Sequence, residues 1–162
     1  MADLAERLND LRVHVRAPRA EIEAELRGHT GVTFSFGESV YGLADESRLA
    51  LAMEAVGRLL RVGWVRQYRE ALDGTGLYTD SNDPQNLTFF ADRANIVSVA
   101  ESSDGRITIS SSGMDSFSVD IKPGTVYELS ADEFCASASE AATKLAQDFL
   151  AKVQELKKQH YQ

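Results

Sequence analysis

The chain has 162 residues, of which 43% are hydrophobic and 26% are charged, and its formal net charge is −8. This length and balance predict one ordinary globular domain or two very small ones, and they exclude a disordered chain. They also argue against tight, direct binding to DNA, because no segment has a clear excess of the Lys and Arg residues that neutralise phosphates.

The sequence also predicts the cellular location of the protein. No apolar run approaches the ~20 residues that span a bilayer, and the N-terminus is acidic and amphipathic, which is unlike a signal peptide. The only cysteine, Cys135, cannot form a disulfide within the chain. We therefore expect a cytoplasmic protein without membrane contact.

Residues 2–27 carry two competing patterns. Apolar residues recur three or four positions apart, which predicts a helix with a break near Pro18. From Leu11 to Ala17, however, apolar and polar residues also alternate, as they would in a strand. We prefer the helix.

The next segment predicts a strand followed by a long helix. Residues 32–36 alternate as in a half-buried strand, and residues 39–43 offer a short return strand. Asp45 is a candidate N-cap for a helix that ends near Leu72. Gly57 and Gly63 weaken this helix by ~1 kcal/mol each, so we expect another element to approach closely there.

A polar loop at 80–86 separates two predicted units, 1–76 and 87–162, which can pack as one domain. Residues 87–90 and 95–100 are predicted to be extended. Two further alternating strands follow at 106–110 and 117–122, each after a glycine-containing turn. The pattern predicts an antiparallel β-meander with one face exposed to water.

The last helix has the clearest local signals in the chain. Ser130 and Glu133 have the spacing of a capping box. One apolar stripe then runs from Phe134 to Leu156. A helix over 131–160 would span ~45 Å, which is longer than a small sheet can cover. Part of the stripe should therefore meet another helix or a second subunit, and a homodimer is expected.

The two units also hint at an internal repeat. The strand at 31–36 and the Tyr-x-Leu at 41–43 correspond to the strand at 105–110 and the Tyr-x-Leu at 127–129. If the repeat is real, the chain has a pseudo-two-fold axis and imitates a dimer. The predicted fold class is α+β, with an antiparallel β-meander flanked by long helices.

No constellation of residues indicates catalysis. His14, His29 and His160 share no ligand spacing with each other or with Cys135, so no metal site is predicted. Cys135 follows the start of the last helix beside Phe134 and is interpreted as structural. Paired carboxylates, a nucleophile with its base, and a phosphate-binding loop are all missing. We expect a non-enzymatic protein without a cofactor.

A candidate interaction surface combines the long central helix with the end of the last helix. Trp64 and Tyr68 lie one turn apart and are typical of core or interface anchors. The nearby arginines form either a solvated face, paired with Glu54 and Glu70, or a surface for a phosphate or an acidic partner. The predicted surface comprises Trp64, Tyr68, Arg58, Arg61, Arg66, Arg69, Phe149, Val153 and Leu156.

Residues 95–160 resemble the YbaB/EbfC family, in particular its divergent actinobacterial relatives, some of which accompany type VII secretion loci. The resemblance rests on 104–109, Gly113, 117–123 and the helix start at 130–133. It implies an α+β subunit that dimerises through its sheet, with helices projecting like tweezers. The simplest members of the family bind DNA as nucleoid-associated proteins.

This chain departs from that family in its additional N-terminal unit and in its acidity. Its helices also lack a basic tip, so no DNA-contact residue can be carried over. The expected function is that of a non-enzymatic protein-interaction or accessory factor that acts as a dimer or pseudo-dimer. The alternative is a nucleoid-associated DNA-binding protein. A third hypothesis is a small-ligand or enzymatic role in a pocket between sheet and helix.

Overall fold

The computed structural model describes residues 4–17, 22–36, 41, 45–73 and 83–161. Its helices are α1 (Leu4–Asn9), α3 (Glu46–Asp73), α4 (Pro84–Ala94), α5 (Thr125–Glu128) and α6 (Ala131–Tyr161). One antiparallel sheet contains β1 (Arg12–Ala17), β2 (Ile22–Arg27) and β3 (Gly31–Ser35). The other contains β4 (Val97–Glu101), β5 (Ile107–Ser112) and β6 (Ser116–Ile121). The predicted α+β class, with a meander flanked by long helices, is confirmed.

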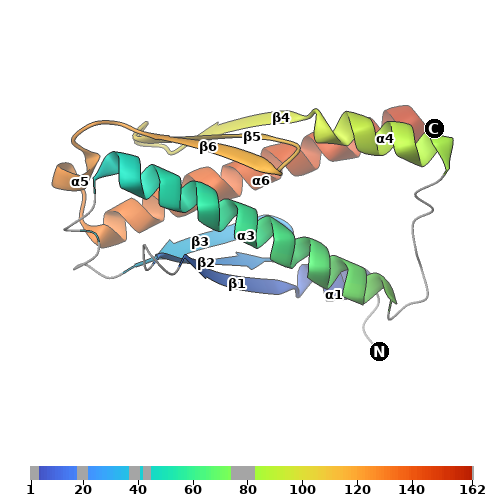
Figure 1. Ribbon diagram of the computed structural model, residues 1–162, viewed down its shortest axis with the longest axis horizontal. Helices are drawn as coiled ribbons and strands as arrows, with labels where there is room; N and C mark the ends of the chain where they lie inside the picture. Colours follow the sequence, from blue (N-terminus) through green and yellow to red (C-terminus); the bar gives the residue numbers. More distant parts are fainter. Residues whose placement is uncertain (1–3, 18–21, 37–40, 42–44, 74–82, 162) are drawn as a thin grey trace.

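Both halves of the chain contain a short helix, a three-stranded meander and a long helix in that order, and in the second half α5 lies between the meander and the long helix. Each long helix also reaches across to the opposite half. α3 packs on β1 and β2 and on β6 of the second sheet, whereas α6 packs on β4 and β5 and on β3 of the first sheet. In Figure 1 the two sheets lie on opposite sides of the pair of long helices. This reciprocal packing is the pattern that a two-fold axis between the halves would produce.

One hydrophobic core joins the two halves. Ile22 and Phe34 from the first half and Ile107 and Phe134 from the second belong to the same buried cluster. The apolar stripe of α6 meets β3, β4, β5 and α4 within the chain. The length of α6 is therefore accounted for without a second subunit, and the homodimer stays a prediction.

The helix predicted over 2–27 is wrong, because among the described residues of this range only α1 is helical, while β1 and β2 form an antiparallel pair. Val13 pairs with Leu26, and Val15 pairs with Ala24. Val13 and Ala17 point into the core, while the intervening basic residues face outward. Pairing with β2 decides the outcome, since the local pattern fits both structures.

The extended segment predicted at 87–90 is also wrong, because it belongs to α4. Asp83 caps this helix by accepting a hydrogen bond from the Gln85 N–H, and Pro84 occupies its first turn, where proline is tolerated. The strand predicted at 95–100 is confirmed as β4. Of the return strand predicted at 39–43, only Tyr41 is described, and its backbone is helical. The break at Pro18 and residues 80–82 of the predicted loop lie outside the described residues, whereas residues 84–86 of that loop belong to α4.

The local helix signals are confirmed. The Ser130 hydroxyl accepts from the Glu133 N–H at 3.1 Å, and the Glu133 carboxylate accepts from the Ser130 N–H at 3.0 Å. The Asp45 carboxylate accepts from the Arg48 N–H at 2.8 Å at the start of α3. A Cβ atom at Gly63 would lie 2.5 Å from Val13 Cγ1. The expected close approach of another element to α3 is therefore present.

Candidate functional site

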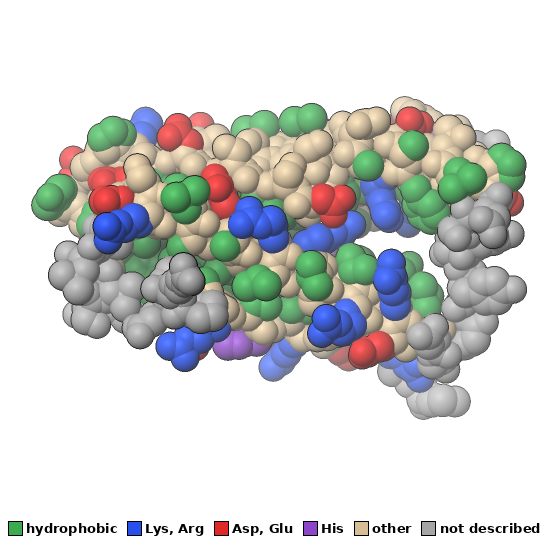
Figure 2. Space-filling model, viewed as in Figure 1, with side chains coloured by type: hydrophobic (Ala, Val, Ile, Leu, Met, Phe, Trp, Pro, Cys, Tyr) green, Lys and Arg blue, Asp and Glu red, His purple; other side chains and the backbone are tan. Residues whose placement is uncertain are grey.

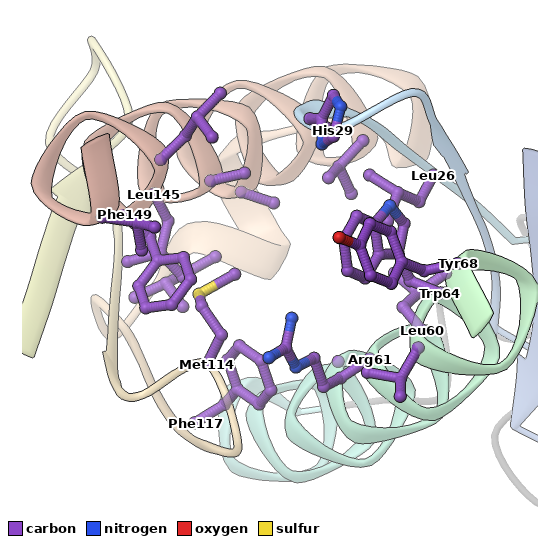
Figure 3. A pocket seen from close by; sticks show the side chains of 18 of the residues that line it. Leu26, His29, Leu60, Arg61, Trp64, Tyr68, Met114, Phe117, Leu145 and Phe149 are labelled. Atoms are coloured by element: carbon purple, nitrogen blue, oxygen red, sulfur yellow. The ribbon is translucent and has the colours of Figure 1, made fainter. Parts of the chain in front are cut away.

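A cavity of about 650 Å³ lies between α3 and α6 and the strands that face them. Its apolar lining comes from both halves of the chain, with Leu60 and Trp64 on α3, Leu145 and Phe149 on α6, and Phe117 on β6. Figure 3 shows these side chains arranged as a ring around an open centre. Figure 2 shows hydrophobic and basic side chains along the hollow between the two helices.

One wall of the cavity is held by an aromatic pair on α3. Trp64 and Tyr68 stack with ring centroids 5.1 Å apart and planes inclined by 18°. The Trp64 indole donates a hydrogen bond to the Gly28 carbonyl at 3.2 Å, at the turn between β2 and β3. The His29 ring packs 5.7 Å from Trp64. The aromatic wall is therefore held by ring contacts between lining residues and by a hydrogen bond to Gly28, which is not part of the lining.

The opposite wall is formed by α6 and the second sheet. In Figure 3, Leu145 and Phe149 lie across the opening from Trp64 and Tyr68, and Met114 lies beside them. Val153 continues this lining along α6. The arrangement offers apolar surface on both sides of a space large enough for a small molecule, since ligand pockets typically measure about 300–1,000 Å³.

The ionisable side chains around the cavity are all basic. Among the described residues that line it are His29, Arg61, Arg69, Arg93 and Lys157, and none of the described lining residues is Asp or Glu. The whole chain has a net charge of −8. The sign of the charge at the cavity is thus opposite to that of the protein as a whole.

Arg61 carries the most enclosed of these charges. Its side chain is 19% exposed, and its Nε lies 3.6 Å from an oxygen of Asp115, which is 70% exposed. That separation exceeds a hydrogen bond, so the buried Nε has no hydrogen-bond partner among the described residues. Burial lowers the pKa of Arg61, the Asp115 carboxylate raises it, and the charge of Arg93 lowers it. Figure 3 shows the guanidinium pointing into the opening.

His29 differs from the other basic groups in its charge. Burial, with a further contribution from the charge of Lys157, lowers the pKa of His29 below its ordinary value of about 6.5. The imidazole is therefore neutral at pH 7. The permanent positive charges at the cavity are those of Arg61, Arg69, Arg93 and Lys157.

Arg93 reaches the cavity because α4 is fixed to the end of α6. The His160 ring lies 2.8 Å from the Asp92 carboxylate, and Phe89 is buried against the rings of His160 and Tyr161. The Arg93 guanidinium packs 5.2 Å from the centre of the Phe90 ring. The contact between these helices thus presents Phe90 and Arg93 to the cavity.

The structure divides the predicted interaction surface. Six of its residues line the cavity: Trp64, Tyr68, Arg61, Arg69, Phe149 and Val153. The other three do not line it, since Arg58 and Arg66 are exposed on α3 and Leu156 is half-buried on α6. Sequence reasoning missed Arg93 because residues 87–90 were interpreted as extended. It also missed His29, for which no sequence signal was available.

Other candidate groups are less informative. Burial raises the pKa of the half-buried Cys135 thiol, which disfavours the thiolate needed for a nucleophile. Within the described part of the chain, no three His, Cys, Asp or Glu residues are grouped as metal ligands would be. No described helix combines the length and apolar character needed to cross a bilayer.

Comparison with protein-family models, with curated proteins and with solved structures finds no match to this chain. The resemblance to the YbaB/EbfC family therefore stays a prediction. The functional argument rests on the cavity itself.

Proposed function

We propose that the protein is a non-enzymatic binding protein that encloses the apolar part of a ligand between α3 and α6. The observation that carries this proposal is the cavity of about 650 Å³ with apolar walls contributed by both halves of the chain. Well-packed interiors contain few voids larger than a water molecule. A hollow of this size with fixed aromatic walls is therefore better explained as a binding site than as a packing defect.

The composition of the cavity supports binding over catalysis. Its described lining includes no carboxylate and no Ser, Thr or Cys, and its one hydroxyl is that of Tyr68. A nucleophile activated by an adjacent base needs both groups within hydrogen-bond reach. Here the His29 ring packs against Trp64, and neither the Tyr68 hydroxyl nor the Lys157 amine is hydrogen-bonded to it among the described residues.

We also propose that the protein acts as a pseudo-dimer, a single chain whose two halves pack together as two subunits would. The reciprocal packing of α3 and α6 on both sheets supports this, because each helix buries its stripe within the chain. A cytoplasmic location is part of the same proposal, on the ground that Cys135 is the only cysteine. DNA binding is a weaker alternative, since the chain has a net charge of −8 and no segment with a clear excess of Lys and Arg.

Binding of a neutral, environment-sensitive dye tests the proposal. N-phenyl-1-naphthylamine should bind the full-length protein with increased fluorescence and one saturable site. Ala142→Phe, which places a ring in the cavity wall of α6, should abolish this signal. The matched control is Ala151→Phe, because Ala151 is exposed on the same helix and does not line the cavity.

Thermal unfolding of both variants establishes that they are folded. If Ala142→Phe does not fold, Val65→Phe on the opposite wall takes its place. Absence of dye binding by the wild-type protein would overturn the proposal. Equal binding by the folded cavity variant and the control would overturn it as well.

A further inference from the structure

The charges at the cavity restrict the chemistry of the ligand that it can bind. Arg61, Arg69, Arg93 and Lys157 line it, but Arg69 and Lys157 are exposed to solvent, so the enclosed charges are those of Arg61 and Arg93. The only described carboxylate that pairs with any of the four is Asp115, at 3.6 Å from Arg61. Asp115 is largely exposed, so solvent screens its effect on the interior. An apolar space with uncompensated positive charge matches a molecule that is apolar over most of its length and anionic at one end.

The most favourable position for the anion is at Arg61 and Arg93. Both side chains line the cavity and are half-buried, and the charge of Arg93 lowers the pKa of Arg61. Arg61 lies over the Trp64 ring at 5.7 Å from its centre, and its Nε is buried without a hydrogen-bond partner among the described residues. An anion between the two arginines would relieve their repulsion and accept hydrogen bonds from their guanidinium groups.

The size of the cavity suits a small amphiphile. Its volume of about 650 Å³ lies within the range of about 300–1,000 Å³ that is typical of small-molecule pockets. An alkyl chain can lie along the space between Trp64 on α3 and Phe149 on α6.

We propose that the cavity binds a long-chain carboxylate, with its tail between α3 and α6 and its carboxylate at Arg61 and Arg93. A carboxylate matches the planar guanidinium fork through two parallel hydrogen bonds. The inference rests on the proposed binding function and adds the charge and shape of the ligand. It also gives Arg61 a role in selecting the head group.

The fluorescence of Trp64 can report binding, because Trp64 is the only tryptophan in the chain and it lines the cavity. Its fluorescence is followed while dodecanoate, dodecanol or butanoate is added to the full-length protein below the concentration of micelle formation. Dodecanoate should bind at least about tenfold more tightly than dodecanol, the range expected of a charged hydrogen bond. Butanoate should not bind measurably. Between octanoate and dodecanoate, each added CH₂ should strengthen binding about fourfold.

Arg61→Gln tests the assignment of the head group. It should reduce the preference for dodecanoate over dodecanol to less than about threefold. Arg58→Gln is the matched control, because Arg58 lies on the same helix but is exposed and outside the cavity lining. Arg61→Lys should retain part of the preference, since it keeps the charge but loses the fork. If Arg61→Gln does not fold, Arg93→Gln provides the same test from α4.

The outcomes distinguish this inference from the proposed function. Binding of the neutral dye with no preference for dodecanoate would overturn the inference alone. Failure to bind both the dye and the carboxylates would overturn the proposed function as well. If an acidic amphipathic peptide binds more tightly than dodecanoate, the ligand is a protein segment. That result would refute the proposal of a long-chain carboxylate. Retention of the preference by folded Arg61→Gln would refute the role of Arg61.

Discussion

The two ends of the α3–α6 pair differ in how their aromatic side chains are used. At the end where both helices begin, the rings of Phe36, Tyr41 and Phe134 contact one another with centroids 5.5–5.7 Å apart. At the other end, Trp64 and Tyr68 stack on α3. Across the cavity, Phe149 makes no ring contact with that pair among the described residues. The same two helices thus enclose a filled core at one end and a hollow at the other.

The difference shows how a folded chain keeps a hollow open. At the filled end the aromatic rings are each other's partners, and Phe134 is completely buried. At the hollow end the Trp64 indole is hydrogen-bonded to the Gly28 carbonyl and its ring is covered by Tyr68. These contacts hold the wall without closing the space. We therefore expect changes at the filled end to affect stability and changes at the hollow end to affect binding.

The largest expected effect is that of Phe134→Ala. The change removes a fully buried ring and leaves a void, which typically costs about 3–5 kcal/mol of unfolding free energy. Phe149→Ala, at the hollow end of the same helix, should cost less than half as much, because Phe149 is only half-buried beside an existing cavity. Urea denaturation measures both values. Equal losses would show that the two ends do not differ.

The glycines of α3 provide a second test. Gly63→Ala places a Cβ 2.5 Å from Val13 Cγ1, and overpacking of this kind costs about 1–3 kcal/mol, part of which the higher helix propensity of Ala offsets. Gly57→Ala places a Cβ 3.2 Å from the ring of Phe117, which borders the cavity and has room to shift. We expect a lower melting temperature for Gly63→Ala and almost no change for Gly57→Ala. The reverse order would contradict the packing of β1 on α3.

A smaller effect is expected from the removal of one hydroxyl group. The Tyr41 hydroxyl donates to the Leu129 carbonyl at 2.8 Å at the filled end. Tyr41→Phe should therefore reduce the unfolding free energy by about 1 kcal/mol. Tyr68→Phe is the matched change at the hollow end and should alter stability by less than ~0.5 kcal/mol. If Tyr68→Phe reduced the unfolding free energy as much as Tyr41→Phe, the expected difference between the filled end and the hollow end would be wrong.

The smallest expected effect concerns pH and His29. Burial and the charge of Lys157 lower the pKa of His29 in the folded state, whereas in the unfolded chain it is about 6.5. As the pH falls below 6.5, the unfolded state takes up the proton first, so stability decreases until the folded pKa is passed. His29→Gln should therefore lose less stability than the wild type between pH 7 and pH 5. Parallel stability curves for the two proteins would contradict this.

Local chemistry made some elements predictable. Ser130 and Glu133 fix the start of α6 through two hydrogen bonds within one turn, so the residue types and spacing suffice to predict it. Asp83 and Pro84 carried a comparable signal for α4, but the segment after them was interpreted as extended. The long apolar stripes of α3 and α6 were predictable for the same reason: a helix repeats every 3.6 residues.

The β1–β2 hairpin was not predictable from its own residues. Between Leu11 and Ala17 the apolar residues fit both a helical and an alternating pattern. The backbone groups of β1 pair with β2, and Val13 packs under Gly63 of α3, which lies far away in the sequence. The energy of those pairings belongs to the tertiary structure, and it outweighs a weak local preference for helix.

The sequence by itself determined the long helices, the second meander and the capped start of α6, because each depends on residues a few positions apart. It also placed Trp64, Arg61 and Phe149 on one candidate interaction surface of the central and last helices. Only the tertiary structure decided that these side chains line one cavity with His29 and Arg93. The physical reason is that the cavity depends on where α3 and α6 cross between the two sheets, and this crossing is set by contacts between distant residues.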